Sequence, residues 1–309
     1  MEWIEAGVHV PLLIEEPNRH PVSRGVYIKK PAVENHEIYL LLKLIEKHAS
    51  CHSRAFYFSH LIQYYSIMCG RFTHTVDKVE FIIERFKAEL APGFEGYQPS
   101  YNVAPGQLVP VVVAKEGRRY LLNMLWGFVP PWGGKEEGKI MQQINIRDDT
   151  IAKNKFFRDR LSGNRCIFVA DGFYEWQKPT EFRDLPRGEK LPKGVRKTPY
   201  YIIGKERGFL PLAGLWRTAE IKEKPVATAA IITTSPNRVM KEIHNRMPVI
   251  LGNDGVERWL DSAEKKYSHL EELLIPYSAG LTAYVVSDIV NNNRYNDPRC
   301  IEPAASPSS

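Results

Sequence analysis

Apolar residues recur along the chain at two spacings, and these spacings predict where helices and strands form. Val79, Ile82, Ile83 and Phe86 follow the three-to-four-residue period of an amphipathic helix. We expect Thr75 to be the N-cap of this helix, and the helix to end at Pro92-Gly93. A second helical pattern, HEIYLLLKLIEKH, covers residues 36–48.

Short runs rich in β-branched and aromatic residues, separated by Gly, Pro and Asn, dominate the chain from residue 108 onward. They lie at 108–114, 120–128, 165–176, 198–204, 209–216, 226–234, 247–252 and 281–290. Helical patterns return only at 254–260 and 268–276. Successive strands with few helices argue against a doubly wound sheet. We predict an α+β fold: a twisted, largely antiparallel sheet system with a few flanking helices.

The character of the chain changes near Met68. Residues 1–67 hold seven Lys/Arg and seven Asp/Glu, so the net charge of +6 belongs to the rest of the chain. Six of the nine histidines also precede Met68, and this first segment offers little to build a core from. We predict an N-terminal extension over residues 1–67, outside the functional protein, and one domain over 68–309.

The composition is that of a soluble globular protein, with 43% hydrophobic and 25% charged residues. No stretch approaches the ~18 apolar residues that cross a bilayer, and the first residues lack the basic region of a secretion signal. Cys51, Cys69, Cys166 and Cys300 lie far apart, without a CxxC or metal-ligand spacing. We expect a cytoplasmic monomer, associated with the nucleoid in a bacterium, that uses no metal and no cofactor.

A basic segment, residues 177–197, interrupts the strand pattern with seven Lys/Arg, three acidic residues and three prolines. One interpretation is a solvated loop that joins two hairpin strands. The alternative is a basic flap over an anionic ligand.

Five short stretches place unusual polar residues at predicted strand ends. Their residues are Cys69 and Arg71, Asn102 and Pro105, Asn145 and Arg147, Glu175 and Trp176, and His244 and Arg246. Any one stretch alone is typical of a turn or a surface ion pair. Together they suit an anionic, partly aromatic ligand: arginines hold phosphates, and Trp176 and Pro105 offer flat faces to unpaired bases. Glu175 and His244 are a candidate acid/base pair.

The ordered motifs MCGRF, YNVAPGQ, INIR, DGFYEW, HNRMP and VNNNRYNDPRCIEP resemble the SOS-response-associated peptidase (SRAP) family across residues 68–303. Members of this family process abasic sites in DNA. The resemblance implies a barrel-like SRAP fold and a translation start at Met68, with the methionine removed. It further implies that Asn145, Glu175 and His244 assist Cys69, and that Arg71, Arg147, Arg246, Trp176, Pro105 and Asn102 contact DNA.

A cysteine at a free amino terminus carries an amine and a thiol two carbons apart. Its α-amine has a pKa of about 8, so part of it is nucleophilic at neutral pH. Such an amine condenses with the open-chain aldehyde of an abasic site, and the neighbouring thiol then closes a thiazolidine. We therefore predict a protein that binds single-stranded DNA and crosslinks covalently to abasic sites, a lyase-like activity.

Two alternatives use the same residues. The first is a cysteine peptidase or autopeptidase with Cys69, His244 and Glu175 as nucleophile, base and orienting group. Self-cleavage between Met68 and Cys69 would then expose the amine, whereas we favour a translation start at Met68. The second is a module that binds single-stranded DNA without a covalent step.

Overall fold

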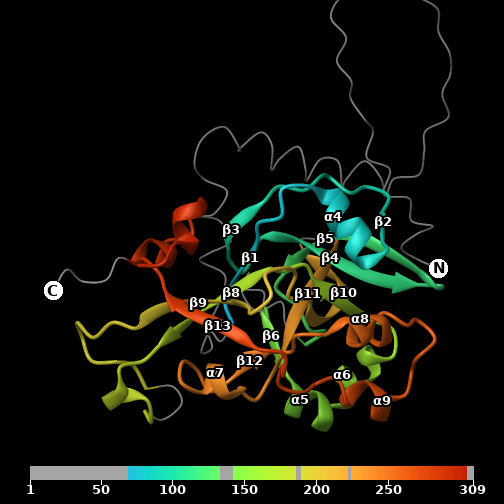
Figure 1. Cartoon of the computed structure of the whole chain (residues 1–309). Coiled ribbons are helices and arrows are strands. Elements are labelled where there is room, and N and C mark those ends of the chain that lie inside the picture. Colours follow the sequence, from blue (N-terminus) through green and yellow to red (C-terminus); the bar gives the residue numbers. More distant parts are fainter. Residues whose placement is uncertain (1–68, 133–141, 186–188, 222–223, 305–309) are drawn as a thin grey trace, which may run out of the picture.

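The computed structural model describes residues 69–132, 142–185, 189–221 and 224–304 (Figure 1). The extension over 1–67 and the helix predicted at 36–48 lie outside these ranges. Strands form at Arg71–His74 (β1), Glu89–Leu90 (β2), Ser100–Val103 (β3), Leu108–Lys115 (β4), Arg118–Trp126 (β5), Asn145–Arg147 (β6), Arg165–Phe168 (β7), Gly172–Gln177 (β8), Thr198–Gly204 (β9), Leu212–Ile221 (β10), Lys224–Thr234 (β11), Met247–Pro248 (β12) and Leu281–Val285 (β13).

Short helices flank these strands. The α-helices are Val79–Phe86 (α4), Asp148–Lys153 (α5), Lys155–Leu161 (α6), Arg238–Lys241 (α7), Asn253–Trp259 (α8) and Tyr267–Glu271 (α9). Single 3-10 turns are Thr180–Phe182 (η1), Asp288–Asn291 (η2) and Pro298–Ile301 (η3). None of the helices in the described parts of the chain is long and apolar enough to cross a membrane.

Five strands close into a barrel. They pair in the order β5, β4, β7, β10 and β11, and β11 returns to β5 through the parallel pairs Thr228 with Leu125 and Ala229 with Trp126. β6 adds to β11 in parallel register, with Ile231 opposite Asn145 and Thr233 opposite Arg147. A second, five-stranded sheet has the order β13, β9, β8, β1 and β3.

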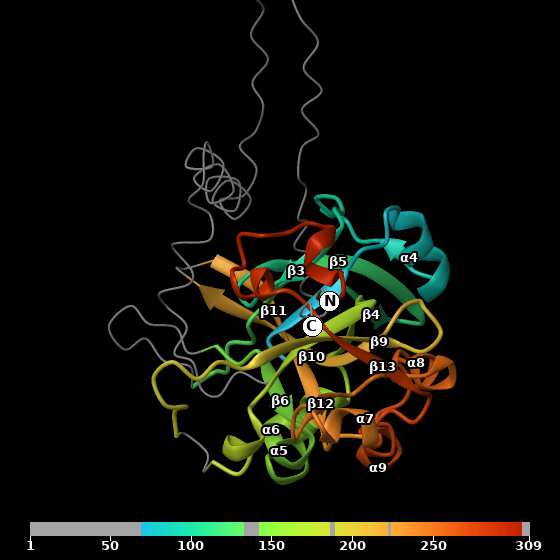
Figure 2. The same cartoon turned by 60° about the vertical axis from the view of Figure 1, so that its left-hand side comes forward.

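Side chains from the barrel strands alternate between two apolar clusters, as the two-residue period of a strand requires. Val111, Cys166 and Ile231 join the cluster that includes Phe72 and Phe173 of the second sheet. The residues that follow these three along each strand join the other apolar cluster, to which the helices also contribute side chains. Figure 1 shows α5, α6, α8 and α9 gathered below β10 and β11, and Figure 2 shows α4 near the upper end of the molecule. The predicted α+β class, mostly sheet with flanking helices, is confirmed.

The first predicted helix is shorter than the apolar pattern indicated. α4 covers only Val79–Phe86, although Ile82 and Phe86 are buried as predicted. Thr75 does not cap it, because the helix begins only at Val79 and Lys78 holds the N-cap position. The backbone N–H and the hydroxyl of Thr75 instead donate to Asp171 Oδ2, at 2.5 and 2.6 Å. The helix ends at Lys87, whose φ of 50° is left-handed, well before Pro92-Gly93.

The predicted strand 165–176 is two strands in different sheets. β7 belongs to the barrel and β8 to the second sheet, because the chain turns between Phe168 and Gly172. The basic segment that follows β8 joins it to β9, and these two strands pair antiparallel from Gly172 with Ile203 to Gln177 with Thr198. The prediction that it connects a hairpin is confirmed. The strands predicted at 247–252 and 281–290 are shorter in the structure, where they form β12 and β13.

Candidate active site

Cys69 lies two residues before the start of β1, and its nitrogen contacts the carboxylate of Glu175. The Cys69 N–H donates to Glu175 Oε1 at 2.5 Å. β1 and β8 are antiparallel neighbours, with Arg71 opposite Tyr174, so the sheet register brings the two residues together. Cys69 is 2% exposed, Glu175 is 2% exposed, and the φ of Cys69 is 47°.

The Cys69 thiol is held in its neutral form. Burial raises its pKa well above the usual value, and the charge of Glu175 together with a hydrogen bond to that carboxylate raises it further. The positive charge of Arg246 acts in the opposite direction. The same carboxylate therefore accepts a hydrogen bond from the Cys69 nitrogen and raises the pKa of the Cys69 thiol.

Arg246 is buried in a polar network that the sequence did not reveal. Its Nη2 donates to Asp148 Oδ1 at 2.7 Å and to the carbonyl of Thr233 at 2.5 Å. Thr234 Oγ1 donates to the other Asp148 oxygen at 2.7 Å. Since Thr233 pairs with Arg147, this network ties Arg246 to β6 and to the start of α5.

His244 precedes Arg246 and is half-buried. Its Nδ1 accepts a hydrogen bond from the backbone N–H of Arg246 at 3.2 Å. In the neutral imidazole this places the proton on Nε2, which leaves Nε2–H as the donor. His244 is thus oriented by the same loop that carries Arg246.

Asn145 and Arg147 occupy the first and last positions of β6, and both are half-buried. Arg147 forms a two-point contact with Asp149, from Nε at 2.9 Å and from Nη2 at 2.7 Å. This pair is accessible, with side chains 36% and 45% exposed. The carboxylate of Asp149 has its pKa lowered to about 2, chiefly by the hydrogen bond from Arg147.

Arg71 and Asn102 hold the C-terminal segment against the second sheet. Arg71 Nη1 donates to Asn102 Oδ1 at 2.6 Å and to the carbonyl of Val290 at 2.8 Å. The buried Asn102 amide donates to the carbonyls of Val290, Asn292 and Tyr295. A role for these two residues in DNA binding stays a prediction, since every contact named here is made within the protein.

Trp176 and Pro105 are half-buried, as flat faces for a ligand need to be. The indole N–H of Trp176 donates to Asn291 Oδ1 at 2.6 Å, which fixes its ring at the end of β8. Pro105 lies in the turn between β3 and β4, where Gly106 has a φ of 85°. The stacking role of these two residues stays a prediction.

The structure adds Asp148 and Asn291 to the predicted site. Asp148 directly follows the motif INIR, and Asn291 lies within the motif VNNNRYNDPRCIEP. Nothing in the local sequence indicated that Asp148 would meet Arg246, which is 98 positions away.

Comparison with known proteins is consistent with this arrangement. The family model SOS response associated peptidase (SRAP) matches residues 68–293. The abasic site processing protein YoqW of Bacillus subtilis is 37% identical over 239 residues, covering 76% of this chain and 99% of its own. The abasic site processing protein HMCES of Gallus gallus is 33% identical over 228 residues, covering 67% of each chain.

Solved structures share the fold. A crystal structure of a protein from Bacteroides thetaiotaomicron has a TM-score of 0.59 at 22% identity, covering 77% of this chain and 100% of its own. A crystal structure of a phage-related protein from Bordetella bronchiseptica has a TM-score of 0.51 at 26% identity, covering 71% of this chain and 94% of its own. The family match and the level of identity to YoqW show that this chain belongs to the SOS response associated peptidase (SRAP) family.

Proposed function

We propose that this protein processes abasic sites in single-stranded DNA by forming a covalent crosslink through Cys69, as the first residue of the working protein. The contact between the Cys69 nitrogen and Glu175 Oε1, at 2.5 Å between two buried groups, carries the proposal. Its relatives are named abasic site processing proteins, which supports abasic DNA as the substrate.

The chemistry begins at the Cys69 amine. The amine adds to the aldehyde carbon of the opened abasic sugar, and loss of water leaves an imine. The thiol sulfur then adds to the imine carbon and its proton passes to the nitrogen, which closes a thiazolidine. The sequence of steps is redox-neutral and uses no co-reactant.

Glu175 suits the proton transfers of both steps, because it accepts a hydrogen bond from the Cys69 nitrogen and acts on the pKa of the Cys69 thiol. It accepts the proton that the ammonium must lose before attack. The raised pKa of the thiol suits the second step, since sulfur stays protonated until the imine has formed. We assign His244 to proton transfer at the sugar ring oxygen and Asn145 to holding the opened sugar.

DNA binding falls to accessible cations and aromatic faces around this site. Arg147 is paired with the accessible Asp149, so it can exchange that partner for a phosphate. Trp176 and Pro105 offer stacking faces. Arg246 is 8% exposed and bonded to Asp148, so we assign it to tuning Cys69 and organising the loop.

The test is a crosslinking assay with single-stranded DNA that contains one abasic site. A chain that begins at Met68 should give an adduct that survives a denaturing gel. Cys69→Ala should abolish this adduct and leave binding of intact single-stranded DNA nearly unchanged. Cys300→Ala, which removes another buried thiol, is the matched control and should crosslink normally.

Other outcomes point to the alternatives. An adduct that persists in Cys69→Ala excludes the thiazolidine. Turnover of peptides that depends on Cys69 and His244, without an adduct, indicates a peptidase. Reversible binding alone, in every variant, indicates a non-covalent binding module.

A further inference from the structure

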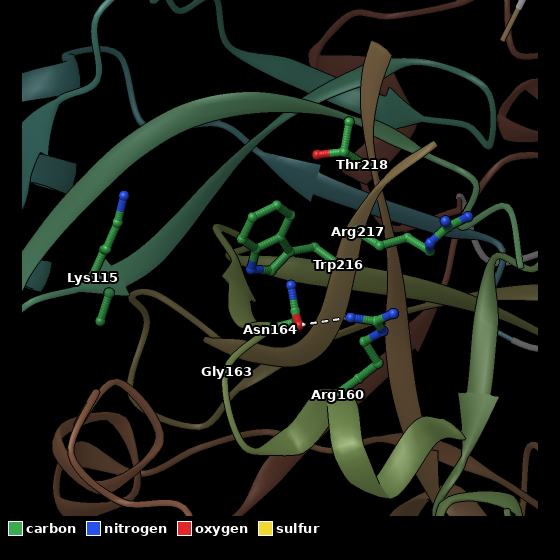
Figure 3. A pocket seen from close by; sticks show the side chains of 8 residues that line it. Lys115, Arg160, Gly163, Asn164, Trp216, Arg217 and Thr218 are labelled. Carbon is green, nitrogen blue, oxygen red and sulfur yellow. Dashed lines mark hydrogen bonds between the residues drawn. The ribbon is translucent and has the colours of Figure 1, made fainter. Parts of the chain in front are cut away.

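A pocket of about 370 Å³ lies between β4, β10 and the segment that follows α6, apart from the Cys69 site (Figure 3). It is lined by Ala114, Lys115, Arg160, Gly163, Asn164, Trp216, Arg217 and Thr218. Arg217 of β10 lies opposite Thr228 of β11, whereas Arg147 of β6 lies opposite Thr233 of the same strand. Five strand residues separate the two positions, roughly 16 Å at about 3.3 Å per residue.

The lining carries three cationic side chains and no carboxylate. Figure 3 shows the Arg160 side chain rising from α6 toward the strand that bears Arg217. Within the ranges that the structure describes, neither arginine forms an ion pair. Arg160 Nη1 donates to Asn164 Oδ1 at 3.3 Å, and Arg217 Nη1 donates to the carbonyl of Val129 at 2.6 Å.

Both guanidinium groups keep unused hydrogen-bonding capacity. The buried Nε of Arg160 and the buried Nε of Arg217 have no acceptor among the described residues. The buried Arg165 shows what the same fold does when it satisfies an arginine. Its guanidinium donates to four backbone carbonyls, those of Leu161, Trp259, Asp261 and Glu264.

The two arginines also repel each other. The pKa of Arg217 is lowered, first by burial and then by the positive charge of Arg160. Two cations that share a partly buried site without a carboxylate raise the free energy of the folded protein unless an anion joins them. A pocket of this size suits a small ligand with several acceptor oxygens.

We propose that this pocket binds a phosphate group between Arg160 and Arg217, as a second anion site that nothing in the chemistry at Cys69 requires. A phosphate oxygen pair matches the fork of an arginine, and a small rotation of each guanidinium offers Nε and Nη together. Lys115 and the Thr218 hydroxyl complete a polar rim. The phosphate comes either from the DNA backbone or from a small phosphorylated molecule.

Inorganic phosphate is the probe, titrated into the full chain by calorimetry and by thermal melting. The wild type should show saturable binding, which weakens about tenfold in Arg160→Gln and in Arg217→Lys, because each loses a charge-assisted contact. Arg85→Gln is the matched control: Arg85 also has an Asn partner and also lies over a neighbouring Phe ring. It should bind phosphate normally.

The comparison between variants is the measure, because phosphate also stabilises folded proteins non-specifically. Without phosphate, Arg160→Gln should melt no lower than the wild type, since it removes a repulsion. Absence of saturable binding, or an equal loss in Arg85→Gln, overturns the proposal. Cys69→Ala should keep the phosphate response, so this result is independent of the crosslinking test.

The source of the phosphate follows from binding of lesion-free single-stranded DNA at several salt concentrations. If the backbone occupies the pocket, Arg160→Gln lowers the slope of log K against log salt by about 0.7. If a small phosphorylated molecule occupies it, the slope stays at the wild-type value while the phosphate response is lost.

Discussion

The carboxylate of Glu175 accepts a hydrogen bond from the Cys69 nitrogen and raises the pKa of the Cys69 thiol, so its removal should act on the chemical step and not on DNA binding. In Glu175→Gln the shape and the hydrogen bond remain, but the side chain no longer takes a proton. We expect the rate of adduct formation to fall by about 10²-fold or more, the range of general base catalysis.

Single-turnover crosslinking measures the rate, and fluorescence anisotropy measures the affinity for single-stranded DNA. Glu181→Gln, an exposed acid in η1, is the control and should match the wild type. Adduct formation by Glu175→Gln at the wild-type rate would remove Glu175 from the proton transfer.

Arg147 and Arg246 differ in burial, so replacing Arg147 should affect DNA binding, whereas replacing Arg246 should affect stability. Arg147→Ala should lower the salt slope of single-stranded DNA binding by about 0.7 and leave the melting temperature nearly unchanged. Arg246→Ala leaves the Asp148 carboxylate without its buried partner, which costs about 3–5 kcal/mol of stability.

Salt titrations of DNA binding and thermal melting of the same two proteins separate these effects. A double variant, Asp148→Asn with Arg246→Ala, should recover part of the lost stability because no unpaired charge remains. An Arg246→Ala protein that melts normally would show that the Asp148 pair is not a stabilising contact.

At the scale of a single element, β1 carries a buried histidine that makes stability depend on pH. Burial lowers the pKa of His74 to about 4, and the side chain is 6% exposed. In the unfolded chain His74 takes up a proton near pH 6.5. The unfolded state therefore binds more protons between these values, and stability should fall as the pH drops from about 6.5 to about 4.

His74→Phe keeps a ring against Tyr97 and removes the titration. Chemical denaturation at pH 7 and at pH 4.5 should show a smaller loss of stability for this variant than for the wild type, by on the order of 2 kcal/mol. Asp149, with a pKa of about 2, titrates below this window. An equal loss in both proteins would assign the pH dependence to other groups.

The longer strands followed from local pattern, and the shorter ones did not. β4 and β9 lie where short runs rich in β-branched and aromatic residues predicted them. β6 has only three residues, and it becomes a strand because Ile231 to Thr233 of β11 pair with it. The helix at Val79 was predicted, but its cap was wrong: Lys78 is the N-cap, and Thr75 lies outside the helix, where it donates to Asp171, 96 positions away.

In the candidate site, too, some features followed from local sequence patterns and others did not. The polar residues at strand ends were visible as motifs, and the contact between Cys69 and Glu175 joins two of them across a pair of antiparallel strands. The pairing of Arg246 with Asp148 and the arginine pocket depend on segments distant in sequence. Local spacing carries no information on such contacts.

At the scale of the whole molecule, the proposed chemistry makes activity depend on the position of the amino terminus. A chain that begins at Met68, and loses this methionine, should crosslink abasic single-stranded DNA efficiently. The 309-residue chain should be inert until residues 1–68 are removed, because an internal Cys69 has an amide nitrogen and not an amine.

Intact-mass measurement of the protein within the adduct is the check. A crosslinked species that begins with Cys69 supports the proposal, and an adduct that retains the peptide bond between residues 68 and 69 excludes the amine mechanism. Cys69→Ala in both chain lengths is the control for adducts that form elsewhere.

The positive φ of Cys69 has a consequence for that peptide bond. A residue with a side chain at a φ of 47° stores roughly 1 kcal/mol of torsional strain. The angle exists only while residue 68 supplies the preceding carbonyl carbon. A chain that starts at Cys69 has no φ there, so the strain vanishes and its nitrogen is free to turn within reach of Glu175. Loss of the preceding residue therefore gives rotational freedom to the nitrogen that, in the proposed reaction, attacks the abasic sugar.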